Sequence, residues 1–418
     1  MRLRRVFSIG VIGNGLTFFS NFLIPPLFIA QLGTERYGAW LYLFTIPTML
    51  AAFDLGVSAA FSTSVYQHHS EGNLLTATRM FKTGVKVLGA LMLLVLALAA
   101  TVLIFLYTKY GGTELHATVF ILCAYVLSGF MAELLSSSFK ITGRYHQYQL
   151  INLCSKTLEL TSLILLIQSN DFRLMALSLL VIRLSSMCGT TWWAMKLTPE
   201  LMTGSWRGYE RFRHLLLPSL MYATNPLIMF LSLQVPLLVI APAAGLTAVV
   251  IYTTVRTLAR LPLQISSQIS FSLYTEYTRL QSENQNEMTE HLYGRGLRLI
   301  VILFVAYCAI GLLLGQTAYK YWIKEVPPHF LLLFLILLTD AFFESLMRHR
   351  ISLSSATNVH SRDTLFQLCT VTTSVAMMWI AAQFSNDIIH ILIPAAAITL
   401  LMTIRLLGRA PRKNRLSF

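Results

Sequence analysis

Residues 248–273 read AVVIYTTVRTLARLPLQISSQISFSL, and this stretch decides the class of the protein. It contains no charged side chain apart from Arg256 and Arg260. An α-helix needs about 20 predominantly apolar residues to cross the hydrocarbon core of a bilayer. The stretch therefore predicts a membrane helix, and it raises the question of why two permanent positive charges lie inside it.

The rest of the chain repeats this pattern. Of its 418 residues, 55% are hydrophobic and 12% are charged, whereas a soluble domain carries about 25% charged residues. Such runs are too long for barrel strands, and helices satisfy their own backbone hydrogen bonds in lipid. We therefore expect an all-α polytopic membrane protein with twelve spans, near residues 7–30, 37–62, 85–107, 117–139, 150–169, 173–195, 214–240, 247–273, 297–318, 329–347, 363–384 and 388–407.

The basic residues predict the orientation in the membrane. When residues within three positions of a span end are counted with the adjacent connection, 23 of the 32 Lys and Arg fall in the termini and the even-numbered connections, 5 in the odd-numbered connections and 4 in the spans. Cytoplasmic loops carry the excess of positive charge in membrane proteins. Both termini are therefore expected in the cytoplasm, and the net charge needs no nucleic-acid partner to explain it.

The connections and small motifs exclude several classes of protein. The outward connections are too short for an external catalytic domain, and no G-x-x-x-x-G-K-[ST] loop is present for nucleotide hydrolysis. The five cysteines stand singly, which favours core packing over a metal site. The glycines of GVIGNG (10–15) are interpreted as allowing close helix packing. These features favour a secondary transporter without a cofactor over an enzyme.

Prolines suggest two related halves. Pro25 and Pro26 lie late in the first span, while Pro218, Pro226 and Pro236 punctuate the seventh. Proline removes a helical hydrogen bond and kinks the helix, so the first helix of each six-span half is expected to be broken. This indicates an N-terminal bundle over residues 1–200 and a C-terminal bundle over 201–418, although proline is also common in membrane helices generally.

Ionisable residues inside the spans are candidate functional residues, because a central charge facing lipid costs at least about 2.5 kcal/mol. Lys156 and Glu159, three residues apart, are expected to neutralise one another. Glu133 lies near a cytoplasmic end and can pair locally. The full set is Asp54, Glu133, Lys156, Glu159, Arg183, Arg256, Arg260, Asp340 and Glu344.

Two hypotheses explain Arg256 and Arg260. They lie about 13 Å and about 20 Å from the outer end of their span, on one helical face. The pair either binds an anion, since an arginine fork engages two phosphate oxygens at once, or forms an ion-pair network. The carboxylates available for such a network are Asp54, Asp340 and Glu344.

Four stretches resemble a known family. YGAWLYLFTIPTMLAAFDLGVSAAF (37–61) is similar to the second-helix signature of bacterial polysaccharide flippases. The resemblance continues in ELLSSSFKITGRYHQYQL (133–150), YTTVRTLARLPLQ (252–264) and SLSSATNVHSR (352–362). The chain thus resembles the O-antigen and exopolysaccharide flippases of the multidrug/oligosaccharidyl-lipid/polysaccharide flippase superfamily. One departure is Gln234, where some relatives carry an acid, so cation coupling through that helix is in doubt.

The resemblance implies two six-helix bundles around a central cavity in the bacterial inner membrane. It also implies passage of an undecaprenyl-diphosphate-linked glycan from the inner to the outer leaflet by alternating access. Arg256, Arg260 and Arg183 would then contact the diphosphate or line the cavity. Gating or ion coupling would fall to Asp54, Asp340, Glu344 and Glu133.

Several alternatives remain open. Transport can be coupled to H⁺, to Na⁺ or to the membrane potential alone. Partners would include membrane lipids, a polysaccharide polymerase and chain-length proteins. A multidrug or cation antiporter of the same superfamily is the first alternative, although it would need acids rather than arginines in its cavity. A membrane assembly factor without transport activity is the second.

Overall fold

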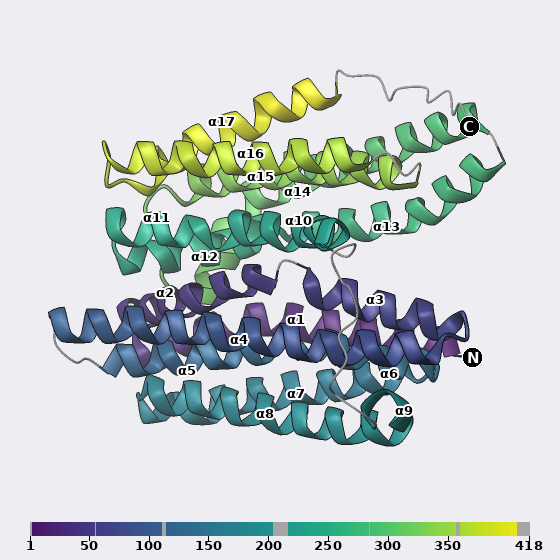
Figure 1. The fold of residues 1–418 in the computed structure, drawn as a ribbon. Helices are drawn as coiled ribbons and strands as arrows, with labels where there is room; N and C mark the ends of the chain where they lie inside the picture. Colours follow the sequence, from purple (N-terminus) through teal and green to yellow (C-terminus); the bar gives the residue numbers. More distant parts are fainter. Residues whose placement is uncertain are drawn as a thin grey trace. The chain divides into compact units, whose positions relative to one another are not determined.

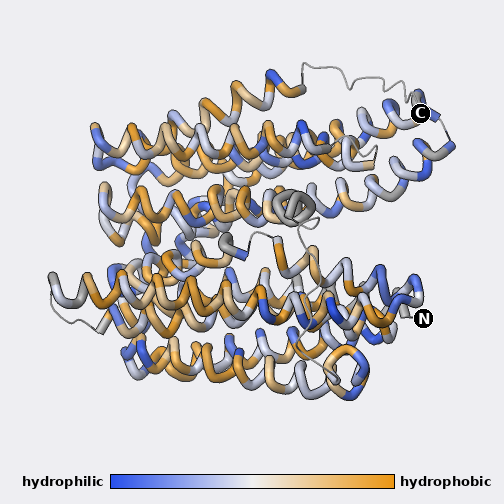
Figure 2. Tube along the Cα trace, viewed as in Figure 1, coloured by the Kyte–Doolittle hydropathy of each residue, from blue (hydrophilic) through white to orange (hydrophobic). Residues whose placement is uncertain are grey.

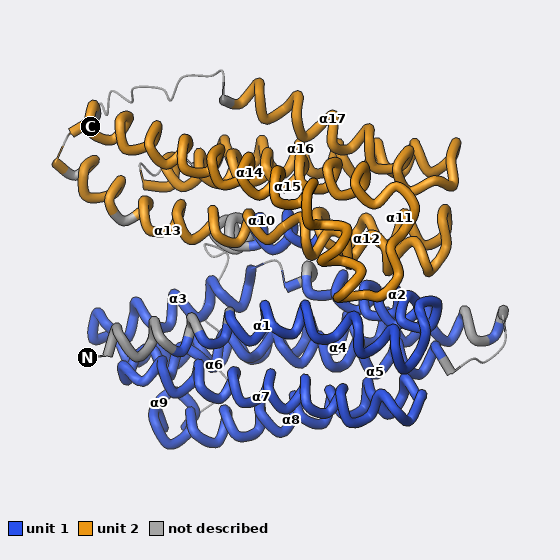
Figure 3. The backbone as a smooth tube through the Cα atoms, turned by 180° about the vertical axis from the view of Figure 1, so that it is seen from behind, with its two compact units in different colours: residues 1–230 blue, residues 231–418 orange. Residues whose placement is uncertain are grey.

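The computed structural model describes residues 2–54, 56–110, 114–203, 216–283, 285–356 and 360–407. Every regular element in these residues is a helix (Figure 1). The chain divides into two compact units, residues Met1–Phe230 and Leu231–Phe418 (Figure 3). This division lies inside a helix, and the boundary near residue 200 that a six-plus-six arrangement suggests stays a prediction.

The helices have the following bounds. Unit 1 contains α1 (Arg2–Leu32), α2 (Thr34–Leu50), η1 (Ala51–Asp54), α3 (Val57–Ser70), α4 (Leu74–Tyr110), α5 (Glu114–Ser128), α6 (Phe130–Ile141), α7 (Tyr145–Leu166), η2 (Ile167–Ser169), α8 (Phe172–Leu197), α9 (Pro199–Met202) and most of α10 (Leu216–Leu233). Unit 2 contains α11 (Val235–Ala244), α12 (Leu246–Ala259), α13 (Leu261–Ser282), α14 (Asn286–Ile323), α15 (Phe330–Ala356), α16 (His360–Ala382) and α17 (Ile388–Leu407).

The structure confirms an all-α polytopic membrane protein. In the described part of the chain, 10 helical stretches are long and apolar enough to cross a membrane. Figure 2 shows hydrophobic residues along these helices and hydrophilic residues near several helix ends. The two remaining expected spans, 37–62 and 247–273, are also helical, but each is interrupted in its middle.

The break in the second span is built by an acid and a glycine. α2 passes through η1 into Gly56, which has a left-handed backbone conformation with a φ of 68°. A residue with a Cβ is disfavoured there. The Asp54 carboxylate then accepts two hydrogen bonds from Ser58, from its N–H at 3.1 Å and its hydroxyl at 2.6 Å. Asp54 therefore caps the first turn of α3.

The seventh and eighth spans are also broken. α10 ends at Leu233 and α11 begins at Val235, with Pro236 in its first turn. Because the Leu237 N–H bonds to the Gln234 carbonyl at 3.0 Å, the Leu233 carbonyl loses its usual donor. α12 ends at Ala259, and Pro262 lies in the first turn of α13. The predicted proline break thus occurs in span 7, whereas α1 continues through Pro25 and Pro26.

Two packing interpretations of the sequence are wrong for some of their residues; Cys123 is buried, as expected, and the surroundings of Gly10 lie outside the described residues. A Cβ added at Gly13 or Gly15 would meet nothing within 4 Å in the described residues, so these glycines do not permit a close helix contact in the structure. Three of the five free cysteines, Cys154, Cys188 and Cys369, are exposed rather than packed in a core. Exposure on an apolar span costs a small thiol little, because lipid chains are themselves apolar.

Each unit has one helical stretch that is more buried than the others. In unit 2 this is α15, with 61% of its most apolar window buried. α15 packs against α12, α13, α14, α16 and α17. In unit 1 the stretch formed by α5 and α6 is 56% buried. These are the fourth and tenth expected spans, and side chains on them are held inside their own unit.

Candidate functional site

The central helix of unit 2 carries two acids one turn apart, Asp340 and Glu344. Glu344 is buried and binds two arginines at once. Its Oε2 lies 2.8 Å from a terminal nitrogen of Arg260, and its Oε1 accepts from Arg348 at 2.6 Å. Shared ion pairs of this kind hold their members strongly when they are desolvated. Glu344 therefore ties the α12–α13 break to α15.

Arg256 has different surroundings. Its guanidinium donates to the Leu233 carbonyl at 2.7 Å and lies 4.8 Å from the centre of the Tyr252 ring. This carbonyl is the one released at the α10–α11 break, at the negative end of the α10 dipole. Within the described residues of unit 2, no acidic side chain lies within 4.0 Å of the Arg256 nitrogens. A guanidinium has five N–H donors, so Arg256 keeps donors for a further acceptor.

Asp340 lines a small cavity inside unit 2. It lies near Thr399 on α17 and interacts electrostatically with Arg260 and Arg256. The Thr399 hydroxyl is also 3.1 Å from that of Ser374 on α16. The cavity has a volume of about 60 Å³, and Glu344 and Tyr252 also line it. This volume accommodates a few water molecules but no sugar unit.

Arg183 lies in unit 1, where it has its own partners. Its Nε is 3.7 Å from the Oε1 of Glu159, and its guanidinium lies 5.0 Å from the centre of the Tyr125 ring. Tyr125 donates to Glu159 at 2.9 Å, so α5, α7 and α8 share one buried polar cluster. The expected pair of Lys156 with Glu159 is wrong: Lys156 is exposed, while Glu159 faces α8. The three-residue spacing favoured a pair within α7, but the packing of α7 against α8 brings Glu159 to Arg183 instead.

Glu133 and Asp54 form separate polar contacts in unit 1. Glu133 pairs locally, as expected, with the Lys140 ammonium at 2.6 Å, and Lys140 also donates to Ser62 of α3 at 3.1 Å. Asp54 bonds to Ser58 and forms no ion pair within the described residues. Its proposed part in gating stays a prediction.

The structure brings together four of the predicted site residues, Arg256, Arg260, Asp340 and Glu344. The prediction from the sequence missed Arg348, because the tenth span was ended at residue 347 and Arg348 was assigned to the cytoplasmic connection. The four-residue spacing from Glu344 to Arg348 was the signal that could have found this partner. The Leu233 carbonyl carries no sequence signal beyond the nearby Pro236.

The fold resembles solved membrane transporters. An inward-facing multidrug resistance MATE family transporter of the MOP superfamily is 12% identical with a TM-score of 0.73, covering 94% of each chain. A MOP superfamily transporter from Pyrococcus furiosus is 12% identical with a TM-score of 0.66, covering 98% of this chain and 94% of that one. An outward-facing MATE family transporter is 13% identical with a TM-score of 0.63, over 98% and 94%. This chain shares the fold of these MOP superfamily transporters.

The sequence of this chain has little in common with the sequences of these structures. Neither a protein-family model nor a curated protein matches the chain. The likeness of fold covers nearly the whole chain, so both units belong to it. At identities of 12–13% the MOP fold does not name the substrate. The choice between substrates therefore rests on the charged side chains.

Proposed function

We propose that this protein is a flippase that moves an undecaprenyl-diphosphate-linked oligosaccharide from the inner to the outer leaflet of the bacterial inner membrane. The two units would alternate between inward and outward access while the polyprenyl tail stays in lipid. The fold supports transport as the general activity. The lack of an acidic partner for the Arg256 side chain in the described part of unit 2 supports an anionic substrate.

The observation that carries the proposal is the half-buried Arg256 guanidinium without an acidic partner in the described residues of unit 2. Burying an uncompensated charge is costly, so such a charge is retained where a ligand completes it. A planar guanidinium donates to two phosphate oxygens at once. Arg256 is therefore assigned the contact with the diphosphate, and Arg260, which is already paired with Glu344, fixes the surrounding helices.

The charge balance of unit 2 supports the same assignment. Arg256, Arg260 and Arg348 face the carboxylates of Asp340 and Glu344, which leaves the group positive when both acids are ionised. An inside-negative potential favours outward movement of an anion by about 2.3 kcal/mol per charge per 100 mV. A diphosphate would therefore gain directly from the potential, whether or not an acid such as Asp340 also carries a coupling ion.

A multidrug or cation antiporter remains the alternative, and one observation favours it. Asp340 has no ion pair within 4.0 Å in the described part of unit 2 and lines a small cavity, as an acid that binds a cation would. The Pyrococcus furiosus transporter is described as having a binding pocket of reverse polarity that suggests a different function. Pocket charge is thus the property to test.

The experiment compares Arg256→Lys, Arg256→Ala and Asp340→Asn in reconstituted vesicles, with transport of lipid-linked oligosaccharide normalised to folded protein. Lysine keeps the charge but loses the two-pronged donor, so we expect Arg256→Lys to lower transport about tenfold and Arg256→Ala to nearly abolish it. Normal transport by Arg256→Ala would refute the diphosphate contact. Cation-driven export of a cationic dye that depends on Asp340 would support the antiporter instead.

A further inference from the structure

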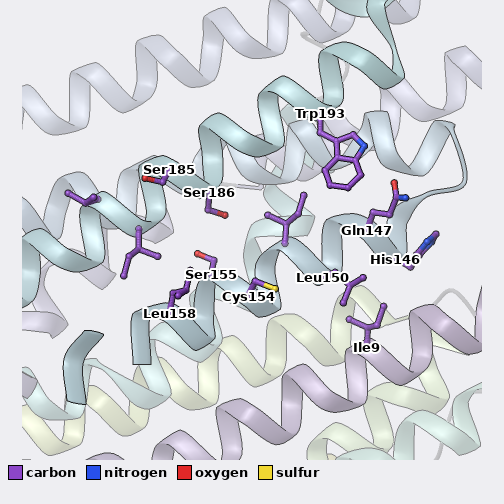
Figure 4. Close-up of a pocket in the computed structure, with 13 residues that line it drawn as sticks. Ile9, His146, Gln147, Leu150, Cys154, Ser155, Leu158, Ser185, Ser186 and Trp193 are labelled. Carbon is purple, nitrogen blue, oxygen red and sulfur yellow. The ribbon is translucent and has the colours of Figure 1, made fainter. Parts of the chain in front are cut away.

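A long groove separates two consecutive helices of unit 1. α7 and α8 are joined by residues 167–171, and close to this connection Ser178 donates to Ser162 at 3.3 Å. Farther from the connection a cavity of about 1000 Å³ lies between the helices, with Ile9 of α1 on its wall. Figure 4 shows lining side chains of α7 and α8 on either side of this space. The two helices are thus in contact at one end and separated at the other.

The groove is apolar and opens to the outside of the helices. Leu150, Leu158 and Val181 line it, and their exposed fractions are 43%, 57% and 54%. Both helices are among those apolar enough to cross a membrane. In a bilayer this surface meets hydrocarbon, so a chain of methylene groups can enter the groove without crossing water.

One end of the groove is polar. His146 and Gln147 line it, and the His146 Nδ1 and Gln147 Oε1 atoms are buried without a hydrogen-bond partner in the described residues. Trp193 lies near them at the same end (Figure 4). Buried polar atoms without partners cost free energy unless a ligand bonds to them. Tryptophan is typical of the membrane–water interface. This end therefore suits the headgroup of an amphiphile.

Two cations flank the same end. Arg144 directly precedes α7, two residues before His146, and Lys196 lies in the last turn of α8, three residues after Trp193. Both are exposed, and neither forms an ion pair within the part of the chain that the structure describes. The distribution of basic residues assigns this end to the cytoplasm. The charges are complementary to a phosphate in the inner leaflet.

We propose that the groove binds one anionic phospholipid of the cytoplasmic leaflet. Its hydrocarbon chain would lie between α7 and α8, its phosphate beside Arg144 and Lys196, and its headgroup hydroxyls at His146 and Gln147. A lipid bound here fills the separated half of the helix pair and holds it together. The proposal does not depend on the transported substrate, because every residue it uses belongs to unit 1 and lies outside the Arg256 group.

The test uses delipidated full-length protein in detergent, titrated with phosphatidylglycerol or phosphatidylethanolamine of identical chains and observed by native mass spectrometry. We expect wild type to retain one phosphatidylglycerol in preference to phosphatidylethanolamine. Removing each cation, in Arg144→Gln and Lys196→Gln, should weaken phosphatidylglycerol binding about fivefold. Both side chains are exposed, so these variants should fold normally.

Groove filling gives a matched comparison. Cys154→Phe combined with Ser186→Phe places two rings in the groove and should lower phosphatidylglycerol affinity at least about tenfold. Cys188→Phe adds one ring at an exposed position of α8 that does not line the groove, and it should bind like wild type, whereas Cys154→Phe alone should already weaken binding. Unchanged binding by the filled variant would overturn the proposal. Displacement of phosphatidylglycerol by equimolar undecaprenyl phosphate would also overturn it, assigning the groove to the tail of the substrate.

Discussion

Arg256 and Arg260 show how two identical residues one turn apart acquire different roles. Arg260 lies at the junction of α12 and α13 and is neutralised by Glu344 at 2.8 Å. Arg256 meets a backbone carbonyl and an aromatic ring, neither of which carries a formal charge. Of the two hypotheses for the pair, the ion-pair network describes Arg260 in this structure. Anion binding remains the proposal for Arg256.

Removing the shared carboxylate should destabilise unit 2. In Glu344→Gln, Arg260 and Arg348 both lose their ion-pair partner, and breaking a buried pair costs about 3–5 kcal/mol. We expect a clearly lower thermal midpoint in detergent. Asp340→Asn is the control, because Asp340 forms no ion pair in the described residues and its loss should cost less. The double variant Arg260→Gln, Glu344→Gln should recover part of the loss, and a double variant less stable than Glu344→Gln would contradict the pairing.

Substitutions of Asp54 should distinguish a structural role of its side chain from a role of its charge in gating. Asparagine caps a helix nearly as well as aspartate, so Asp54→Asn should leave thermal stability nearly unchanged, while Asp54→Ala should cost about 1 kcal/mol. If the charge contributes to gating, transport per folded protein should fall in both variants, with Asp54→Glu less affected. Wild-type transport by Asp54→Asn would reduce the residue to a helix cap.

At the scale of elements, the break between α10 and α11 interrupts the seventh span. Pro236 lacks an N–H, and the resulting break frees the Leu233 carbonyl for Arg256. Pro236→Ala restores a donor and should let α10 and α11 join, so that the Leu237 N–H takes back this carbonyl. We expect folded protein with reduced transport. Pro226→Ala, inside α10 and away from the break, serves as the control; equal transport by wild type and Pro236→Ala would show that the break is dispensable.

Apolar length alone predicted the existence of each helix, because lipid leaves the backbone no other way to satisfy its hydrogen bonds. The breaks at Gly56 and Arg260 were not predicted, since each depends on local backbone geometry and on contacts with other helices. The candidate site residues were also predicted only in part. Buried charge identified Arg260 and Glu344 as candidates, but only packing shows that Arg183 bonds across the bundle to Glu159.

For the whole molecule, the testable property is its orientation. With 23 basic residues on one side and 5 on the other, a reporter fused at either terminus should be cytoplasmic. In a variant lacking the native cysteines, a cysteine at Glu71 should be labelled only from the cytoplasm and one at Phe384 only from outside. Both positions are exposed, which makes them a matched pair. Labelling of Glu71→Cys from outside would overturn the topology.

The pairing of Glu344 with Arg348 on the same helix has a consequence for how the protein is made. The ribosome produces Arg256 and Arg260 well before α15 exists, so both charges enter the membrane ahead of Glu344. Arg256 can donate to the Leu233 carbonyl as soon as α12 is made, because α10 precedes it. Arg260 acquires its carboxylate partner only when Glu344 of α15 is made. When α15 arrives, Arg348 already offsets the charge of Glu344 within one turn, which eases its partition from the translocon into lipid. When α15 docks, Glu344 pairs with Arg260. Assembly of unit 2 is therefore expected to depend on the synthesis of its central helix.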